Sequence, residues 1–378
     1  MSPNSENDVV DKVNGDLNGD SETKNGHIDD HGPLSVPEPD YKLVLKWRNI
    51  LAFIYLHAFT IVSFFYPPVC LSTYIYQFFL AVFIGFGTTA GSHRLFTHRS
   101  YRAKPLLRWF IIYLQTLAGQ EPIYRWVRDH RVHHKFTDTN ADPHNSKRGF
   151  FFSHMGWLCC KKHPDVYKYG KKIDMSDLDD DKVIQFQRKI YTPATFFCSL
   201  ILPTLITMAM GEHWWPSWNF NVARYTIGLH LVWLVNSGAH YWGKRPYEKN
   251  ISASDSYIVA TLALGEGWHN YHHVYPWDYK TAESTRYWFN PTLLFIDVAA
   301  KLGLATDLKV ASDEMIRARV LRTGDGSHKY SKQALIDAEN PLDNNNYDCT
   351  MDHLWGFGDK AMTETDMKNI VIHNREVD

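Results

Sequence analysis

Apolar and polar positions divide the chain into a polar beginning, four long apolar stretches, and polar segments between and after them. The apolar stretches cover residues 50–66, 71–90, 192–210 and 225–242. The second and third contain no charged side chain. About 20 apolar residues in a helix cross a hydrocarbon core of about 30 Å. Buried helices of a soluble protein are the alternative, but uncharged runs of this length favour four transmembrane helices.

The charge of the connecting segments predicts how these helices are oriented. The short connections at 67–70 and 211–219 contain no Lys or Arg, whereas the long segment between the second and third stretches is rich in both. That segment and both chain termini should therefore face the cytosol. The predicted fold is all-α, with four membrane-spanning helices capped by a cytosolic helical domain made of residues 92–191 and 243–330.

The two polar ends of the chain are expected to lie outside this domain. Residues 1–40 carry ten acidic side chains and two lysines, with almost no large apolar residues. Such a segment buries too little surface to offset its ordering entropy, which predicts a disordered acidic leader. Residues 41–330 then form the membrane domain, and residues 331–378 form a polar C-terminal tail.

Histidines are concentrated in three short motifs. The motifs are His93-Arg-Leu-Phe-Thr-His98, His130-Arg-Val-His133-His134 and His269-Asn-Tyr-His272-His273. A ninth histidine, His240, lies at the end of the fourth apolar stretch. Residues three and four apart share one face of a helix, so each HxxHH motif can direct two or three imidazoles to one point. The HxxxxH spacing does not, which predicts a helix end running into a loop.

The predicted topology brings all nine histidines to the cytosolic side of the membrane. Imidazole is the commonest protein metal ligand, and because one metal takes at most about six ligands, nine histidines indicate two metals. Zinc sites use three or four protein ligands, often with cysteine, and no cysteine accompanies these motifs. Iron accepts more imidazoles and activates oxygen. We interpret the motifs as a histidine-rich di-iron site; satisfied core or surface histidines are the alternative.

The histidine motifs resemble those of one enzyme family. The segments HRLFTH, RDHRVHHKFTDTNADPHNSKRGFFFSH, NSGAH and LGEGWHNYHH are similar to those of the membrane acyl-CoA desaturases, the stearoyl-CoA desaturase family. Trp268 and the PWDYKTAE segment are most similar to insect members. The resemblance extends from about Trp47 to Tyr330 and leaves out both polar ends.

The resemblance implies a ligand set, a reaction and a location. Two iron ions would be held by His93, His98, His130, His133, His134, His240, His269, His272 and His273, with Asn236 reaching a metal through water. The enzyme would place a cis double bond in a saturated fatty acyl-CoA, most often at Δ9 of C16–C18 or longer chains. It would use O2 and electrons from cytochrome b5, which an NADH-dependent reductase supplies. It would lie in the endoplasmic reticulum membrane with both termini cytosolic.

The resemblance also implies a substrate site, with the CoA group at the cytosolic surface and the acyl tail in a bent tunnel. The residues at positions that contact CoA are Asn49, Arg128, Asp129, Lys161, Lys162 and Trp233. Gln120 and Trp126 match residues at the bend. Glu121 stands where vertebrate members have Asn, and Val232 stands where they have Thr. These two departures put one head-group contact and one bend contact in doubt.

Two small residues bear on the length of the acyl chain. Ala81 and Gly85 lie four apart on the second predicted helix, where vertebrate members of the family have Tyr and Ala. Small side chains at the closed end of the tunnel would admit C18 or longer chains. The alternative is that another side chain fills the gap.

Other functions remain as alternatives. Insect relatives include enzymes that act at other positions, such as Δ11, and a fatty acyl hydroxylase would share the metal site. A zinc hydrolase or a metal transporter is more distant, since a transporter places ionisable residues at mid-membrane depth and here we expect them at the cytosolic ends. With a net charge of −1, nothing indicates a nucleic-acid partner.

Overall fold

The computed structural model of the chain describes residues 42–336 and 353–374. Helices dominate these residues, and strands are confined to two sheets of two strands each. The mainly helical prediction is therefore confirmed. The predicted acidic leader, and residues 337–352 and 375–378 of the predicted tail, lie outside the described residues.

Three helices of the described chain are long and apolar enough to cross a membrane. They are α2 (Trp47–Phe65), the helix formed by α3 (Leu71–Phe86) with the π-helical segment Gly87–Thr97, and the helix formed by α9 (Lys182–Thr195), the π-helical segment Phe196–Ile201 and α10 (Leu202–Ala209). They include the first three predicted spans. Large apolar side chains of α2, such as Phe64 and Phe65, are three-quarters exposed, as expected of side chains that face lipid.

The fourth predicted span lies within α11 (Trp214–Tyr241), which is equally long but more polar. Arg224 is buried in this helix and donates to Asn221 Oδ1 (2.8 Å) and to the carbonyl of Ser199 (3.1 Å). Because α11 packs against α2, α3 and α10, protein groups accept the hydrogen bonds of Arg224 inside the bundle. The expectation that ionisable residues gather only at the cytosolic ends of the spans is wrong for Arg224.

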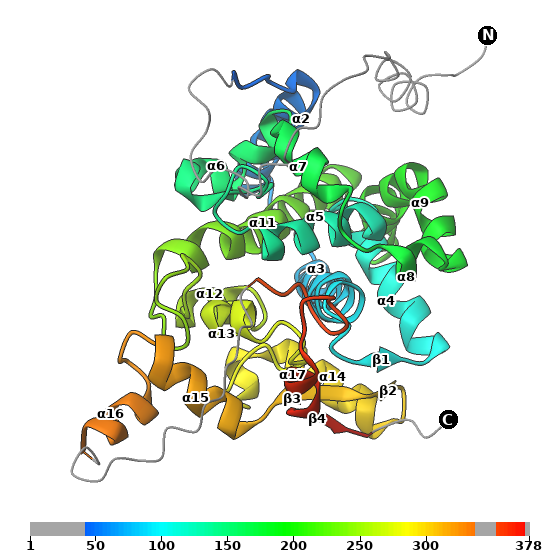
Figure 1. Cartoon of the computed structure of the whole chain (residues 1–378). Helices are drawn as coiled ribbons and strands as arrows, with labels where there is room; N and C mark the ends of the chain where they lie inside the picture. Colours follow the sequence, from blue (N-terminus) through cyan, green and yellow to red (C-terminus); the bar gives the residue numbers. More distant parts are fainter. Residues whose placement is uncertain (1–41, 337–352, 375–378) are drawn as a thin grey trace. The chain divides into compact units, whose positions relative to one another are not determined.

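The segments after the second long helix and after α11 fold into shorter helices. The first group is α4 (Pro105–Ala118), α5 (Ile123–Lys135), α6 (Phe150–His154), α7 (Pro164–Gly170) and α8 (Ser176–Asp179). The second group is α12 (Tyr257–Leu262), α13 (His269–Val274), α14 (Pro291–Lys301), α15 (Asp313–Thr323) and α16 (Lys329–Ile336). The helix α11 runs beside α6 and near α12 and α13 (Figure 1).

Two hydrophobic cores support the helices that carry the histidines. The larger core joins α4, α5 and α14 to the end of the second long helix. The smaller core contains Tyr271 and Val274 of α13, together with side chains of α15 and of the C-terminal residues. The histidine motifs therefore lie on helices that are fixed by packing on their other faces.

Residues 353–374 are part of the fold, although the sequence analysis assigned them to a polar tail. The strand β4 (Ile370–His373) pairs antiparallel with β3 (Leu308–Ala311), and α17 (Glu364–Lys368) begins with a capping box at Thr363. Leu354 and Trp355 are buried. These few apolar residues are spread through a polar segment, so no periodic pattern marked them. The second sheet pairs β1 (Arg102–Ala103) with β2 (Ala305–Thr306).

Candidate metal centre

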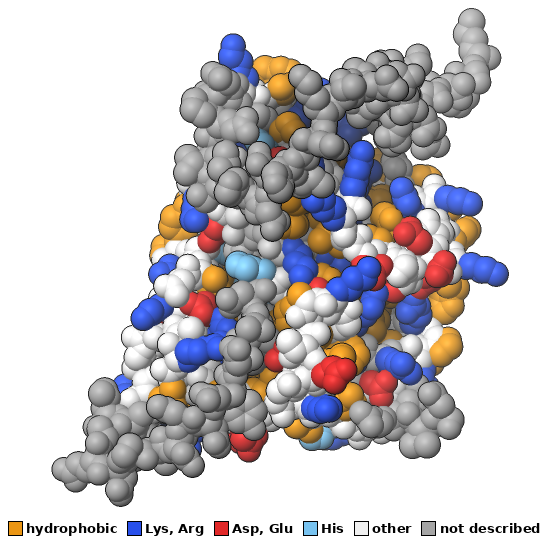
Figure 2. All heavy atoms as spheres, in the orientation of Figure 1, with side chains coloured by type: hydrophobic (Ala, Val, Ile, Leu, Met, Phe, Trp, Pro, Cys, Tyr) orange, Lys and Arg blue, Asp and Glu red, His pale blue; other side chains and the backbone are white. Residues whose placement is uncertain are grey.

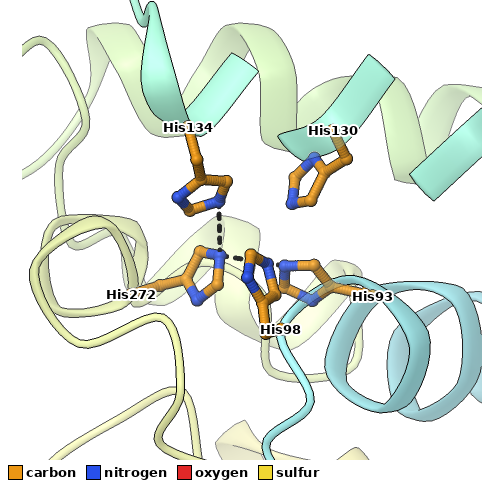
Figure 3. A group of neighbouring side chains, drawn as sticks. All are labelled: His93, His98, His130, His134 and His272. Carbon is orange, nitrogen blue, oxygen red and sulfur yellow. Dashed lines mark hydrogen bonds between the residues drawn. The ribbon is translucent and has the colours of Figure 1, made fainter. Parts of the chain in front are cut away.

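Five histidines from three elements converge in what we call the five-histidine cluster. Each offers a ring nitrogen, and these nitrogens lie within 4.8 Å of one another. Two come from the end of the second long helix, two from α5 and one from α13, and their rings point toward one another (Figure 3). The members are His93, His98, His130, His134 and His272.

The other three motif histidines and His240 form the four-histidine cluster, His133, His240, His269 and His273, again with nitrogens within 4.8 Å of one another. Each HxxHH motif therefore serves both clusters. On α5 the residues four apart go to one cluster and the residue between them to the other, and α13 divides its histidines in the same way. This follows from helix geometry, because residues four apart lie nearly in line while the third is rotated away.

The HxxxxH motif lies where the second long helix ends and a loop begins, as expected, but this helix end is π-helical and brings the two histidines to one side. The N–H of His98 donates to the carbonyl of His93 (3.2 Å), five residues earlier. A π-helical turn spans about one residue more than an α-helical turn. The two histidines therefore lie one turn apart on the same side, with ring centres separated by 4.7 Å. Sequence spacing judged by α-helical geometry could not show this.

The distances between ring nitrogens match ligands around a cation. In the five-histidine cluster, His272 Nε2 lies 2.9 Å from His93 Nε2 and 3.0 Å from His134 Nε2. In the four-histidine cluster, His273 Nε2 lies 3.0 Å from His269 Nε2 and 3.2 Å from His133 Nε2. Metal–imidazole distances of about 2.0–2.1 Å, at right angles, separate two nitrogens by about 3 Å.

The protonation state of His98 also fits a metal ligand. Its Nδ1 contacts the carbonyl oxygen of Trp355, and because a carbonyl only accepts, Nδ1 carries the hydrogen. The Nε2 atom is then an unprotonated lone pair, buried and without a hydrogen-bond partner among the described residues. Burial lowers the pKa of His98 well below its ordinary value, so the ring is neutral and its lone pair is available.

The same neutral form holds for most of the other motif histidines. Burial lowers the pKa of His133 to about 4. It lowers the pKa well below the ordinary value in His130, His134, His269, His272 and His273. Metal ligation requires neutral imidazole. The donor set, its spacing and its protonation therefore fit two metal ions.

Carboxylates fix the orientation of one histidine in each cluster. His93 Nδ1 lies 2.8 Å from Glu266 Oε2, and His133 Nδ1 lies 2.9 Å from Asp142 Oδ1. Metal-binding histidines commonly donate their second N–H to such a group, which sets the tautomer and ring orientation. Neither carboxylate was assigned a role from the sequence.

The two carboxylates are in different electrostatic surroundings. Burial opposes ionisation of Glu266, but Arg94 and His93 hold its pKa below the ordinary value, and Arg94 Nη2 lies 2.9 Å from Glu266 Oε1. Asp142 has no such cation, and burial raises its pKa to about 6. The five-histidine cluster is thus supported by a buried ion pair, and the four-histidine cluster is supported by a carboxyl group that accepts hydrogen bonds from the backbone N–H groups of Asp138 and His144.

Of two polar residues near the four-histidine cluster, Asn236 was expected from the sequence and His144 was not. Asn236 lies one turn before His240 on α11 and is half-buried, which leaves its role through water a prediction. His144 was not a candidate, yet its ring lies 4.3 Å from that of His133, and it forms a third group of nitrogen and oxygen donors with His133 and Asp142. The available signal was that His144 lies in the RDHRVHHKFTDTNADPHNSKRGFFFSH segment, which also contains the second histidine motif.

Three of the expected CoA contacts lie together. Asp129 Oδ1 accepts from Arg128 Nη2 (3.0 Å), and its other oxygen contacts Lys162 Nζ. Asn49 Nδ2 donates to the carbonyl of Leu158 (2.8 Å), which joins the start of α2 to the segment before Lys161. Arg128, Asp129 and Lys162 form a charged group near the start of α2. The predicted orientation of the spans places this end of α2 on the cytosolic side.

The remaining substrate positions divide between the metal centre and the membrane helices. The ring of Trp126 lies 4.9 Å from His130 and 6.2 Å from His93, while Gln120 is half-buried just before α5. The buried Trp233 packs edge-on against Phe53 of α2 (5.4 Å between ring centres). Trp126 is therefore placed beside the five-histidine cluster.

The two expected chain-length residues are both half-buried on α3. A Cβ atom built on Gly85 would lie 2.4 Å from Leu264 Cδ1. Another side chain therefore fills the space beside Gly85, which was the alternative considered from the sequence.

Three further histidines form a hydrogen-bonded chain outside both clusters. His230 Nε2 lies 2.9 Å from His57 Nε2, and His230 Nδ1 lies 2.9 Å from His154 Nε2. His154 Nδ1 continues to Ser237 Oγ (2.8 Å). Because the contacts use different nitrogens of His230, the three rings do not converge on one point. His57 and His154 therefore agree with satisfied histidines rather than with ligands.

Comparison with known proteins identifies the family. The model of the family described as "Fatty acid desaturase" matches residues 68–293. The chain is 45% identical over 344 residues to "Acyl-CoA Delta-9 desaturase" of Acheta domesticus, covering 90% of this chain and 89% of that protein. It is 47% identical to "Acyl-CoA Delta-12 desaturase" of Tribolium castaneum, covering 89% and 94%. It is 46% identical to "Acyl-CoA Delta(11) desaturase" of Trichoplusia ni, covering 78% and 84%. The chain therefore belongs to the fatty acid desaturase family.

Proposed function

We propose that this chain holds two iron ions and places a cis double bond at Δ9 of saturated fatty acyl-CoA, on C16–C18 or longer chains. The reaction class is that of the family, and the chain is an acyl-CoA desaturase, an oxidoreductase. The observation that carries the metal centre is the convergence of nine imidazoles in two groups. No other chemistry in the described residues needs so many ligands.

The overall reaction needs an oxidant and a source of electrons. Two hydrogens leave adjacent methylenes, and with O2, two electrons and two protons they yield an alkene and two water molecules. Bound iron supplies the O2 activation that no side chain provides. We infer that the electrons come from cytochrome b5, which an NADH-dependent reductase reduces. Lys and Arg side chains are spread over the face shown in Figure 2, and such charges favour docking of an acidic partner.

The residues of the chain supply position and exclusion of water. The Arg128–Asp129–Lys162 group would bind the CoA phosphates through its cations, because cationic donors form charge-assisted hydrogen bonds with phosphate oxygens. Asn49, Lys161 and Trp233 would hold the rest of the head group. Gln120 and Trp126 would hold the acyl chain where it bends beside the five-histidine cluster. Regiochemistry is then a matter of geometry, since it depends on which carbon lies beside the metal.

The setting of the protein is a membrane, and its three apolar helices and its family agree on this. We propose that α11 is a fourth span, that the chain lies in the endoplasmic reticulum membrane, and that both termini are cytosolic. The polar side chains of α11 are compatible with a span that protein surrounds. Because all nine histidines lie at the ends of these helices or after them, this topology puts the metal centre on the cytosolic side.

Expression in a desaturase-deficient yeast tests the reaction and its position together. We expect growth without added unsaturated fatty acid, and cis-9 16:1 and 18:1 in the lipids after gas chromatography and mass spectrometry of derivatised double bonds. Double bonds at Δ11 or Δ12 instead would retain the desaturase and change the position, as the names of the relatives allow. Hydroxy acids would support the hydroxylase alternative. The proposal would be contradicted if the protein inserts correctly but the lipids of the cells contain only saturated acyl chains.

Chain-length selectivity provides a separate test at the closed end of the tunnel. We expect Ala81→Tyr to shift the preference toward shorter acyl chains, by roughly 10-fold in the C18 to C16 ratio, since a difference of one methylene in a hydrophobic pocket is worth about 1–3 kcal/mol of discrimination. Lipid profiles of the same yeast strain measure this ratio. Phe79→Tyr, at an exposed position of the same helix, is the matched control. An unchanged ratio would mean that Ala81, like Gly85, faces other side chains rather than the substrate.

A further inference from the structure

The C-terminal residues reach the metal centre through backbone contacts with His98. The carbonyl of Trp355 accepts the Nδ1 hydrogen of His98. The N–H of Phe357 donates to the carbonyl of His98 (2.9 Å). One three-residue stretch thus grips both the side chain and the main chain of a single expected ligand.

Gly356, between these two contacts, has no space for a side chain. Its φ of +152° lies in a region that residues with a Cβ rarely adopt, and a Cβ built there would lie 2.6 Å from both the Cα and the carbonyl oxygen of His98. The backbone of the C-terminal segment therefore lies directly against the backbone of His98. Glycine is required at this position because two segments of the backbone approach each other closely.

Charged side chains hold the same stretch in place. The Trp355 ring lies between the guanidinium groups of Arg99 (4.9 Å) and Arg131 (4.1 Å). Asp359 accepts the N–H of Trp355 (3.0 Å) and pairs with Lys135 Nζ (2.9 Å). Lys135 and Arg131 belong to α5, which carries the second histidine motif. The segment is thus anchored to the two elements that supply four of the five clustered histidines.

The rest of the segment is fixed by packing and by a strand. Leu354, Met362 and Ile370 are buried in the smaller core with Tyr271 of α13. The pairing of β4 with β3 secures the segment at its far end (Figure 1). The contact with His98 is therefore held from both sides, as a positioning contact must be.

We propose that residues 354–359 are a positioning element of the metal centre, and that they make metal binding by the five-histidine cluster depend on docking of the C-terminal segment. The Trp355 carbonyl holds the hydrogen of His98 on Nδ1, so that Nε2 presents its lone pair to the cluster. This inference rests on the proposed function. By contrast, the orienting contacts described for the four-histidine cluster come from Asp142 and Ser252, so its metal should not depend on the segment.

Thermodynamic linkage between metal binding and docking can be measured without an activity assay. If docking of residues 354–359 strengthens metal binding, metal must strengthen docking by the same factor. Loss of a hydrogen bond that orients a ligand costs about 10–100-fold in metal affinity. Removal of metal should therefore increase amide hydrogen exchange in residues 354–362 of the unmutated chain.

The test uses full-length protein purified in detergent. Asp359→Asn removes the ion pair with Lys135 but adds no bulk, and Gly356→Ala blocks the close approach to His98. We expect the unmutated chain to retain two irons, Asp359→Asn to bind the iron of the five-histidine cluster about 10-fold less tightly, and Gly356→Ala to retain about one. Val371→Ala, at an exposed position of β4, is the control and should retain two. Iron is measured by mass spectrometry after dialysis against a chelator of graded strength.

The outcomes separate this inference from the proposed function. Fewer than two irons in the unmutated chain would contradict the proposed function. The inference itself fails if Asp359→Asn and the unmutated chain bind metal alike and exchange in residues 354–362 is the same with and without metal. If Gly356→Ala does not fold, as judged by circular dichroism and gel filtration, Asp359→Asn and the exchange measurement decide.

Discussion

The two histidine clusters share α5 and α13 but differ in what holds their ligands in place. The five-histidine cluster draws on the Arg94–Glu266 ion pair and on a backbone carbonyl from Trp355. The four-histidine cluster draws on Asp142, which lies nine residues from His133, and on Ser252, twelve residues from His240. Glu266 and Trp355 are thus distant in sequence from His93 and His98, the histidines that they orient, whereas Asp142 and Ser252 are close in sequence to theirs.

This difference has a physical consequence. An oriented ligand binds metal more tightly because its tautomer and ring position are already set. Where the orienting group is local, it forms with the motif itself, whereas a distant group requires the whole fold. The five-histidine cluster should therefore respond to changes far from the histidine motifs, and the four-histidine cluster should respond mainly to changes within them.

The largest expected effect comes from removing one ligand of each cluster. We expect His98→Ala and His133→Ala each to abolish desaturation, below about 1% of the unmutated rate, because the reaction needs both irons. Each variant should keep about one iron and insert normally into the membrane. Product analysis and iron content measure the two effects. A fully active His133→Ala or His98→Ala would remove that residue from the ligand set, and loss of both irons from one variant would show that the clusters are not independent.

A smaller and unequal effect is expected from the two orienting carboxylates. Glu266→Gln leaves Arg94 buried without its anion, which costs about 3–5 kcal/mol when a buried pair is broken. Asp142→Asn leaves no cation behind, so we expect about 10–100-fold weaker metal binding with little loss of stability. Thermal unfolding in detergent and iron content compare the two variants.

Equal destabilisation by the two substitutions would contradict the distinction between the clusters. Glu266→Asp retains the charge and should recover part of the stability that Glu266→Gln loses. Without this recovery, the shape of the side chain rather than the ion pair would be what Arg94 requires.

Much of this architecture could be predicted from the sequence, because it depends on local patterns. Three of the long apolar runs lie in long apolar helices, although two of these helices extend well beyond the predicted bounds, to Thr97 and back to Lys182. The three histidine motifs and His240 contain every member of both clusters. The division of the histidines between two metals was not predicted, since it depends on how α5, α11 and α13 face one another. The HxxxxH pair was misjudged because π-helical geometry leaves no periodic signal.

The contribution of residues 353–374 could not be predicted for a different reason. Trp355 acts on His98 through a backbone carbonyl, and a carbonyl has no residue identity that a sequence can display. Gly356 and Asp359 were visible, but only the close approach to His98 and the pairing with Lys135 give them meaning.

The smallest effect on stability is expected from Glu283, whose hydrogen-bonded neighbours pack against α13. Both clusters take histidines from α13. Glu283 accepts from His328 Nε2 (2.6 Å), Lys329 Nζ (2.8 Å) and Tyr247 Oη (2.9 Å), and the Tyr247 ring packs 5.1 Å from that of Tyr271 in α13. Burial opposes ionisation of Glu283, but these hydrogen bonds dominate and lower its pKa to about 2.

Because this pKa lies below the value of about 4.3 in an unfolded chain, the interaction stabilises the fold fully above that value and is lost as the pH falls toward 2. Glu283→Gln should therefore lower the free energy of unfolding near pH 7 by about 1–3 kcal/mol, and the difference from the unmutated chain should shrink near pH 3. Thermal unfolding at the two pH values measures this. Since α13 supplies ligands to both clusters, the variant should lose the two irons to the same extent. Selective loss of one iron would mean that the contacts of Glu283 stabilise only one cluster.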